Sequence, residues 1–334
     1  MKEKLLKFKE AFSKAPAVIR NFYTETRDGL LETLEKSRDL TKTNYELGLF
    51  HLEKGNIADA KMRFSFVIRL NKQFAMAYYH LARCHFYEMK IEKAKQALET
   101  CLELDPNNLS AQYRFKIINH QYNESYIPAE IVKEDYNSSA HSYEDIMVNN
   151  FKYEAPDILA KSIATYINKE DSYKALDIGC GTGLAGYSLA QEVSLKSLIG
   201  IDISTKMLEL TKTLEKDGNN IYTELKEMDF HDLELLKDKY GIILACLSLG
   251  YVNDFSNFYK KLDKLVKNGV IFGIVVLKSN AGDIEFNYDQ ACFAYSAKFL
   301  KEISQKFNWD ILEEKEIVLF CNNTKGLMFI LTKK

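Results

Sequence analysis

The stretch ALDIGCGTGLAG, residues 175–186, decides how this chain folds. Gly179, Gly181 and Gly183 alternate with other residues, and Asp177 stands two positions before the first of them. The preceding residues are apolar, as expected where a buried strand turns through a loop into a helix. Glycines in such a loop remove the side chains that would keep a ligand from the backbone N–H groups. The stretch therefore predicts a ligand-binding loop at the carboxyl end of a strand.

The residues around the glycines restrict the ligand. A triphosphate loop needs the pattern GxxxxGK[ST], and no lysine follows the glycines here. The dinucleotide pattern GxGxxG needs a third glycine where Leu184 stands, and starting it at Gly181 fails because Gly186 falls one position late. Asp177 would also repel a phosphate. Both phosphate ligands are therefore disfavoured.

Acidic residues are expected at the ends of the next two strands as well. Asp202 ends the apolar run LIGIDI, and Asp229 follows in EMDF. A carboxylate at the position of Asp202 can accept hydrogen bonds from both hydroxyls of a ribose. The alternative is a glycine turn without a ligand, in which the aspartates are only solvated. Such a turn readily explains one aspartate at a strand end but explains three at matching positions less well.

The spacing Asp177-x-Gly179-x-Gly181-x-Gly183 resembles motif I of the class I S-adenosylmethionine-dependent methyltransferases. S-adenosylmethionine carries a sulfonium and an ammonium, which suits a carboxylate at the strand end, in direct contact or through water. The resemblance implies this cofactor and apolar contacts to its adenine. The residues expected to bind it are Tyr136, Tyr143, Asp177, Gly179, Cys180, Gly181, Gly183, Asp202, Ile203, Met207, Met228, Asp229 and Phe230.

Residues 136–156, YNSSAHSYEDIMVNNFKYEAP, extend the resemblance. They are similar to the segment that leads into the methyltransferase domain of predicted bacterial methyltransferases with tetratricopeptide repeats. The resemblance implies a helix that covers the cofactor, with Tyr136 and Tyr143 facing the pocket. Packing of both tyrosines against the sheet is the alternative.

The first part of the chain has an internal repeat. Within residues 41–107, an offset of 34 pairs Leu47 with Leu81, Gly48 with Ala82, Ala60 with Ala94, Phe64 with Leu98, and Leu70 with Leu104. This resembles the tetratricopeptide repeat, a helix-turn-helix unit of about 34 residues. Helices in 1–40 and 109–122 are expected to cap or extend the two units. Such repeats imply a protein or peptide partner, although a purely architectural role is equally open.

The second part alternates short β-branched runs with helical stretches. The fold class predicted for the whole is α + α/β: helical tetratricopeptide-like repeats in 1–120, a linker in 121–140, and a Rossmann-like, doubly wound, seven-stranded methyltransferase domain in 141–334. The last two strands follow one another closely, which predicts an antiparallel pair at the sheet edge.

Composition excludes some classes of function. The net charge of -2 gives no basic field for nucleic acid, and no apolar run approaches the 18 residues of a membrane span. The six cysteines are scattered, with no pattern of metal ligands, so we expect no metal site. Their scatter also argues against a disulfide framework and favours the cytoplasm.

The methyl acceptor and the catalytic residues stay open at this stage. The chain departs from the related family at Gly241, Leu247, Cys292 and Tyr295, positions expected on the acceptor side of the pocket. The weak candidates for catalysis are His141, Tyr251 and Tyr295. A protein and a small molecule are both open as acceptor. A non-catalytic adaptor, with a degenerate cofactor domain, is the alternative function.

Overall fold

The computed structural model describes residues 39–252 and 254–333. The chain divides into two compact units, one with the residues up to Leu52 and Asn56–Gln112, the other with Glu53–Gly55 and the residues from Tyr113 onward. The predicted boundaries at 120 and 140 stay predictions. The cap helix expected within residues 1–40 lies outside the described residues, apart from its last two positions.

The first unit is built from antiparallel helices. Helical backbone over residues 39–53 is followed by α3 (Ile57–Leu70), α4 (Ala75–Tyr87) and α5 (Ile91–Leu104), and α6 (Leu109–Ile118) continues toward the second unit. The small residues Ala60 and Ala94 are fully buried, as are Phe64 and Leu98. A Cβ at Gly48 would lie 2.6 Å from the ring of Phe64, so only glycine permits this approach of the two helices. The repeated small residues therefore mark helix contacts, as the sequence predicts.

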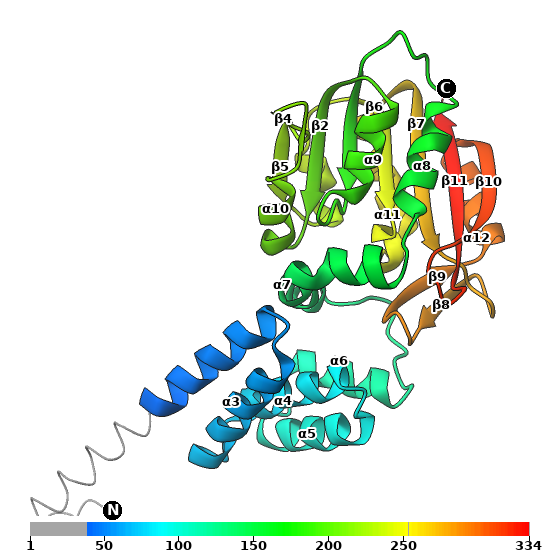
Figure 1. Ribbon diagram of the computed structural model, residues 1–334. Coiled ribbons are helices and arrows are strands. Elements are labelled where there is room, and N and C mark those ends of the chain that lie inside the picture. The colour runs from blue at the N-terminus through cyan, green and yellow to red at the C-terminus, as the bar shows by residue number, and fades with distance from the viewer. Residues whose placement is uncertain (1–38, 253, 334) are drawn as a thin grey trace, which may run out of the picture. The chain divides into compact units, whose positions relative to one another are not determined.

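The second unit contains one seven-stranded sheet with the order β10-β11-β7-β6-β1-β2-β5 (Figure 1). Strands β1, β2, β5, β6 and β7 are parallel, and β11 pairs antiparallel with both β7 and β10. The predicted sheet and its antiparallel edge pair are confirmed. The strand bounds are Tyr173–Ile178 (β1), Leu195–Asp202 (β2), Glu224–Glu227 (β5), Tyr240–Cys246 (β6), Val266–Leu277 (β7), Asp310–Val318 (β10) and Lys325–Lys333 (β11).

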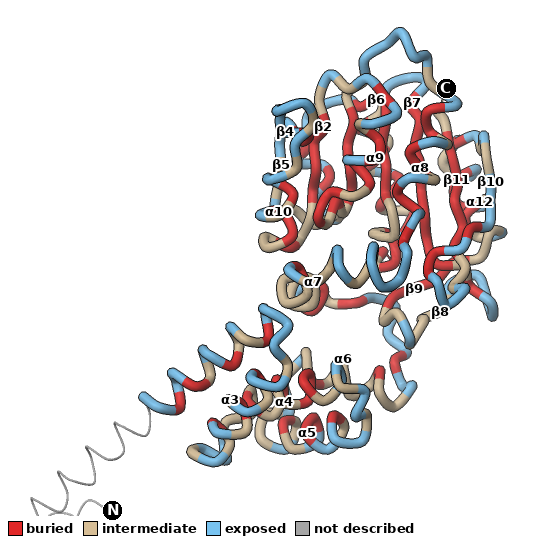
Figure 2. Tube along the Cα trace, viewed as in Figure 1, coloured by how far each residue is buried: buried red, intermediate tan, exposed pale blue. Residues whose placement is uncertain are grey.

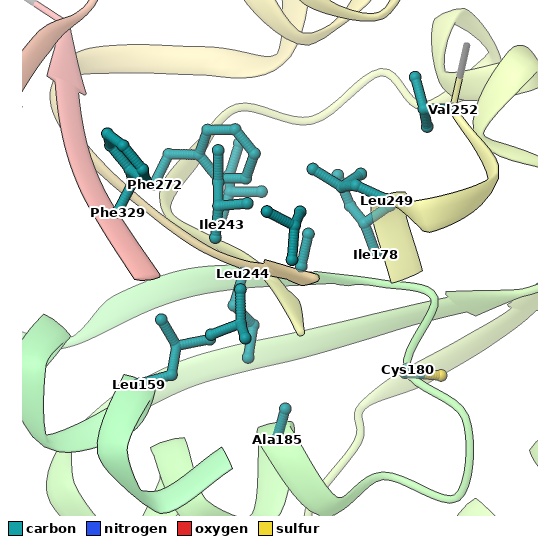
Figure 3. Close-up of a cluster of buried hydrophobic side chains, with 14 of the residues drawn as sticks. Leu159, Ile178, Cys180, Ala185, Ile243, Leu244, Leu249, Val252, Phe272 and Phe329 are labelled. Atoms are coloured by element: carbon teal, nitrogen blue, oxygen red, sulfur yellow. The ribbon is translucent and has the colours of Figure 1, made fainter. Parts of the chain in front are cut away.

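Helices cover both faces of this sheet. The bounds are Ala155–Ala164 (α8), Leu184–Glu192 (α9), Thr205–Thr211 (α10), Phe255–Leu262 (α11) and Ala297–Lys306 (α12). Neighbouring residues of β7 face opposite ways: a Cβ at Gly273 would meet Leu159 of α8, whereas the ring of Phe272 lies 6.3 Å from that of Phe258 in α11. Figure 3 shows Phe272 and Leu159 on opposite sides of the strands. The central strands are buried, whereas the edge strand β10 and the outer faces of the helices are largely exposed (Figure 2).

Helix α7 (Ala129–Glu144) lies across the carboxyl ends of the parallel strands (Figure 1). A π-helical turn, Asp145–Asn150, follows it. Part of the expected linker is therefore helix. Its Ile131 and Val132 lie in the hydrophobic core of the second unit, and its Ala140 is also buried. Asparagines and serines between these apolar residues hide the helical period in the sequence.

Short elements complete this unit. Two small hairpins are formed by β3 (Glu215–Lys216) with β4 (Asn219–Asn220) and by β8 (Ile284–Asn287) with β9 (Cys292–Tyr295). The 3₁₀ turns are η2 (Phe230–Leu235), η3 (Ser248–Tyr251) and η4 (Asp263–Leu265). Within the described part of the chain, none of the helices combines the length and the apolar character needed to cross a membrane.

Candidate cofactor and acceptor site

The glycine loop joins β1 to α9 at the carboxyl edge of the sheet. Gly179, Gly181 and Gly183 all have positive φ, at 68°, 56° and 91°, a region that side-chain-bearing residues rarely occupy. A Cβ at Gly179 would lie 2.3 Å from Cβ of Ser248, and one at Gly183 would lie 2.5 Å from Leu214. A Cβ at Gly181 would meet nothing within 4 Å. Two of the glycines therefore serve close packing, while the third presents its backbone to open space.

Hydrogen bonds fix the shape of the loop. The amides of Gly179 and Cys180 both donate to the carbonyl of Ile201, at 2.8 and 2.9 Å. The buried hydroxyl of Thr211, on α10, donates to the carbonyl of Gly181 at 2.6 Å. The loop is thus tied to β2 and α10 and does not depend on a ligand for its conformation. The side chain of Cys180 is buried, so only its backbone is available to a ligand.

Asp177 lies beneath the loop, and only 1% of it is exposed. Its Oδ2 accepts a 2.6 Å hydrogen bond from the hydroxyl of Tyr222, and the carboxylate also accepts from the amide of Gly186. Burial raises its pKa to about 7, and the hydrogen bond from Tyr222 opposes that rise. The expected attraction of this carboxylate for the cofactor, in direct contact or through water, stays a prediction. In the structure the buried carboxylate holds the end of β1 and Tyr222 together.

Asp202 is half-buried at the end of β2. Its Oδ2 accepts from the amide of Gly181 and its Oδ1 from the amide of Ser204, both at 2.8 Å. Burial raises its pKa, and these amides oppose the rise. Each carboxylate oxygen can accept more than one hydrogen bond, so both keep capacity for a further donor. The two amides hold the carboxylate in a fixed orientation beside the open face of Gly181.

The residues expected around the adenine divide into two groups. Ile203, Met228 and Phe230 are half-buried and keep surface for a ligand. Met207 is fully buried and packs under α10, because its position on the short helix faces the core. The carboxylate of Asp229 caps η2 and accepts from the amide and ring of His231, at 2.7 and 2.8 Å.

Helix α7 brings its tyrosines over this edge. The hydroxyls of Tyr136 and Tyr251 lie 2.9 Å apart, and the ring of Tyr143 packs edge-on against that of Tyr136 at 6.2 Å. The negative charge of Asp202 contributes to the raised pKa of both α7 tyrosines, after the larger effect of burial. Asn137 fixes the helix, because its Oδ1 accepts from the hydroxyl of Ser204 at 2.8 Å.

The remaining catalytic candidates lie apart from this cluster. His141 is exposed on α7. Tyr295 is fully buried, and its hydroxyl contacts the carbonyls of Leu249 and Val252 at 2.8 and 2.6 Å. Its ring packs at 5.0 Å from that of Phe255. Tyr295 is therefore a core residue that fixes the η3 turn. We had expected its hydroxyl to be a candidate for catalysis, but that hydroxyl is buried against the two carbonyls.

The other departures from the related family also have structural explanations. Gly241 is the second residue of β6, at the opposite end of the strand from the loop, where a Cβ would lie 3.1 Å from Tyr173. It does not approach the acceptor side, contrary to the expectation. Leu247 follows β6 in the left-handed region with φ 61°, and Cys292 is buried beside Gly250. Burial raises the pKa of the Cys292 thiol to about 12, so it stays protonated at neutral pH.

Several residues at this edge carry no signal in the sequence. They are Asn137, Tyr222 and Ser248, the last of which donates to the carbonyl of Ile178 at 2.5 Å. Tyr153 and Cys246 form a further, partly buried pair, with the phenol oxygen 3.1 Å from Sγ. Each acts through a partner far along the chain, which no local motif specifies.

The donor set fits S-adenosylmethionine. It offers free space where Gly181 lacks a side chain, a carboxylate with remaining hydrogen-bonding capacity and half-buried apolar side chains. Among the described residues, the hydroxyl of Thr182 within the loop is buried without a hydrogen-bond partner, so the polar groups of the loop are incompletely satisfied. Ile203, Met228 and Phe230 would contact the adenine, and Asp202 would hold the ribose. The described residues contain no group of three or more His, Cys, Asp or Glu placed to hold a metal ion.

Comparisons with known proteins agree with this fit. Residues 169–316 match the family described as a methyltransferase domain, and residues 75–108 match the tetratricopeptide repeat. The chain is 28% identical over 163 residues to a demethylmenaquinone methyltransferase of Staphylococcus saprophyticus, which covers 48% of the chain and 67% of that protein. It is 33% identical over 129 residues to a ubiquinone biosynthesis O-methyltransferase of Pelagibacter ubique, covering 38% of the chain and 47% of that protein. The chain thus spans about half the length of the second relative.

Solved structures share the fold. The [4+2]-cyclase SpnF superposes with a TM-score of 0.53 at 14% identity, over 62% of this chain and 97% of that one. A Burkholderia thailandensis 1,6-didemethyltoxoflavin-N1-methyltransferase, solved with bound 1,6-didemethyltoxoflavin and S-adenosylhomocysteine, superposes with a TM-score of 0.50 at 14% identity, over 62% of this chain and 88% of that one. At such identities the likeness establishes the fold alone. The two family matches show that residues 169–316 resemble a methyltransferase domain and residues 75–108 a tetratricopeptide repeat, which supports an S-adenosylmethionine-dependent methyltransferase with a repeat module.

Proposed function

We propose that this methyltransferase binds its cofactor on the β1–α9 loop and transfers the methyl group to a small organic acceptor. In this proposal the open backbone of Gly181 faces the cofactor and Asp202 accepts both ribose hydroxyls. The observation that carries it is the pairing of these two residues: the amide of Gly181 donates to Asp202 at 2.8 Å, which fixes a carboxylate beside an unobstructed backbone.

The bound cofactor supplies an electrophilic methyl group on a sulfonium, so the protein needs mainly to align the acceptor and exclude water. A methyl group supplied in this way would leave its electron pair on the sulfur of the cofactor, and the methylated acceptor would release its proton to solvent. Tyr136 and Tyr251 are placed to orient the acceptor. Burial raises the pKa of both phenols well above the usual value, so they donate hydrogen bonds at neutral pH and do not act as bases.

The relatives support a small acceptor over a protein. Two of their names refer to demethylmenaquinone and to ubiquinone biosynthesis, whereas a further relative, at 23% identity, is named for malonyl-[acyl-carrier protein], a group carried on a protein. We therefore assign the tetratricopeptide repeat a separate role in binding a protein or peptide partner. The proposal also places the protein in the cytoplasm, where the six unpaired cysteines would stay reduced.

Isothermal titration with S-adenosylhomocysteine tests the cofactor part of the proposal. We expect binding in the micromolar range. Transfer of a labelled methyl group from S-adenosylmethionine to low-molecular-weight material then tests the acceptor class. Absence of heat and of thermal stabilisation with both cofactor forms would favour the adaptor alternative, and labelling of protein alone would contradict a small acceptor.

A further inference from the structure

A pocket of about 180 Å³ lies beside the paired phenols of Tyr136 and Tyr251. Three separate segments of the second unit form its walls: the stretch from Tyr113 through α7, the end of η3, and the turn between β8 and β9. The residues that line it are Tyr113, Ile127, Ile131, Val132, Asp135, Tyr136, Ser139, Tyr251, Gln290 and Ala291.

The walls are held by contacts independent of a ligand. The hydroxyl of Tyr113 donates to the carbonyl of Ala291 at 3.0 Å, which joins the start of the unit to the β8–β9 turn. Tyr288 in the same turn donates to the carbonyl of Tyr122 at 3.0 Å. Ala291 has a positive φ of 49°, a conformation that alanine adopts only under constraint from its surroundings. The pocket is therefore a built feature of the fold.

Its size suits a single ring. An apolar cavity of about 150 Å³ is large enough to bind benzene. The side chains of Ile127, Ile131, Val132 and Ala291 and three tyrosine rings give this pocket a mainly apolar and aromatic surface. A flat molecule of one ring with a short substituent fills such a volume.

The polar groups restrict the substituent. Tyr136 and Tyr251 share one hydrogen bond between their hydroxyls, at 2.9 Å, so one phenolic proton of the pair is left to donate to a ligand. Among the described residues that line the pocket, Asp135 carries the only charge, and Arg114 pairs with it. An anionic ligand would lose its hydration there and find no cation in the lining to replace it.

We propose that this pocket receives the methyl acceptor, an uncharged one-ring aromatic molecule whose hydroxyl or amino group bonds the Tyr136–Tyr251 pair. This rests on the proposed function, since it makes Tyr136 the wall shared by cofactor and acceptor. Carboxylate acceptors are excluded from the pocket by its lack of a lining cation.

Ligand-observed NMR on the full chain, with saturating S-adenosylhomocysteine, tests the pocket with phenol, aniline, toluene and benzoate. We expect phenol and aniline to bind, toluene to bind about fivefold more weakly for want of one hydrogen bond, and benzoate to show no binding. Tyr136→Phe/Tyr251→Phe should remove the difference between phenol and toluene. Benzoate binding as tightly as phenol would overturn the inference.

Substitutions that fill the pocket give the second measurement. Ile131→Trp and the half-buried Ser139→Phe should each lower phenol binding at least tenfold while the dissociation constant for S-adenosylhomocysteine changes less than threefold. Because Ser139 is less buried than Ile131, Ser139→Phe still tests the pocket if Ile131→Trp does not fold. Val148→Trp, at a position 41% exposed after α7, is the matched control and should change neither.

Unchanged phenol binding in both filled variants would place the acceptor elsewhere and refute the inference. If the wild-type protein fails to bind S-adenosylhomocysteine, the proposed function fails, and phenol binding measured without it still decides the pocket.

Discussion

The hydroxyl of Tyr222 donates a 2.6 Å hydrogen bond to the carboxylate of Asp177, and both side chains are buried. The two residues are 45 positions apart, and their contact joins the end of β1 to the segment before β5. A buried carboxylate with one phenol and one amide as donors is only partly compensated for its lost hydration. This explains why burial dominates and the pKa of Asp177 rises to about 7.

The first prediction concerns stability against pH. Because the folded pKa of Asp177, about 7, exceeds the unfolded value of 3.8, the folded state holds this proton more tightly between those values. This contribution to stability is fully present below pH 3.8 and is lost as pH rises through about 7. Asp177→Asn should remove about 2.5 kcal/mol of the difference in unfolding free energy between pH 5 and pH 8.

Urea unfolding at both pH values measures that difference. Asp232→Asn, at an exposed position, is the control and should leave it unchanged. An equal pH dependence of the unfolding free energy in wild type and Asp177→Asn would show that the pKa of Asp177 is not raised in the folded protein.

The second prediction separates two glycines of the loop. Both have positive φ, so alanine at either position costs about 1 kcal/mol in backbone strain. Gly179→Ala adds a clash with Ser248 and should lower the melting temperature more than Gly181→Ala. Gly181→Ala places its methyl group in open space and should weaken binding of S-adenosylhomocysteine at least tenfold. Thermal unfolding and calorimetry on both variants measure the contrast, and equal affinities would argue against a cofactor beside Gly181.

The third prediction concerns Asp202. Replacing it by alanine removes the acceptor for the amides of Gly181 and Ser204 and, in the proposed function, for both ribose hydroxyls. Two lost charge-assisted hydrogen bonds correspond to a loss of about 100-fold or more in affinity for S-adenosylhomocysteine. Calorimetry on Asp202→Ala measures it, with Asp232→Ala as the control. Binding within tenfold of wild type would mean that Asp202 does not hold the ribose.

Much of this site follows from the sequence because its motifs are local. The periodicity of the sequence predicts the order of strands, loops and helices. That order in turn predicts the seven-stranded sheet, the glycine loop after one strand and Asp202 at the end of the next. Tyr222 and Ser248 could not be found this way. Each matters through one contact, with Asp177 or Gly179, that exists only after the strands are assembled.

Burial is the other property that the sequence left undetermined. Asp177 and Met207 occupy positions typical of cofactor contacts, yet both face the core. Gly241 belongs to the right strand but to its distant end. In α7 the polar residues Asn137, Ser138 and Ser139 separate apolar turns, so a packed helix resembles a linker. A strand or helix can be predicted from its period, whereas the direction of one side chain depends on what packs against it.

The fourth prediction concerns the first unit. Gly48→Val would push a branched side chain into the ring of Phe64, which lies 2.6 Å from the site of a Cβ. Overpacking of this kind costs about 1–3 kcal/mol, so the helical unit should unfold at lower temperature. Limited proteolysis followed by mass spectrometry locates the weakened region. Cleavage confined to residues beyond 113 would contradict the prediction.

The last prediction tests the assignment of Tyr295 to the core. Its hydroxyl contacts two carbonyls of the η3 turn, at Leu249 and Val252, and Tyr295→Phe leaves these groups buried with one donor fewer. We expect a loss of about 1–3 kcal/mol in unfolding free energy. Affinity for S-adenosylhomocysteine should change less than threefold, because the phenol lies outside the acceptor pocket. Tyr251→Phe is the matched comparison. The hydroxyl of Tyr251 lies within hydrogen-bond distance of the phenol of Tyr136, so its removal should cost less stability than Tyr295→Phe and affect phenol binding more. If Tyr295→Phe instead weakened phenol binding more and stability less than Tyr251→Phe, Tyr295 would again be a catalytic candidate. A tyrosine needed only for packing should affect the unfolding free energy more than the binding of a ligand.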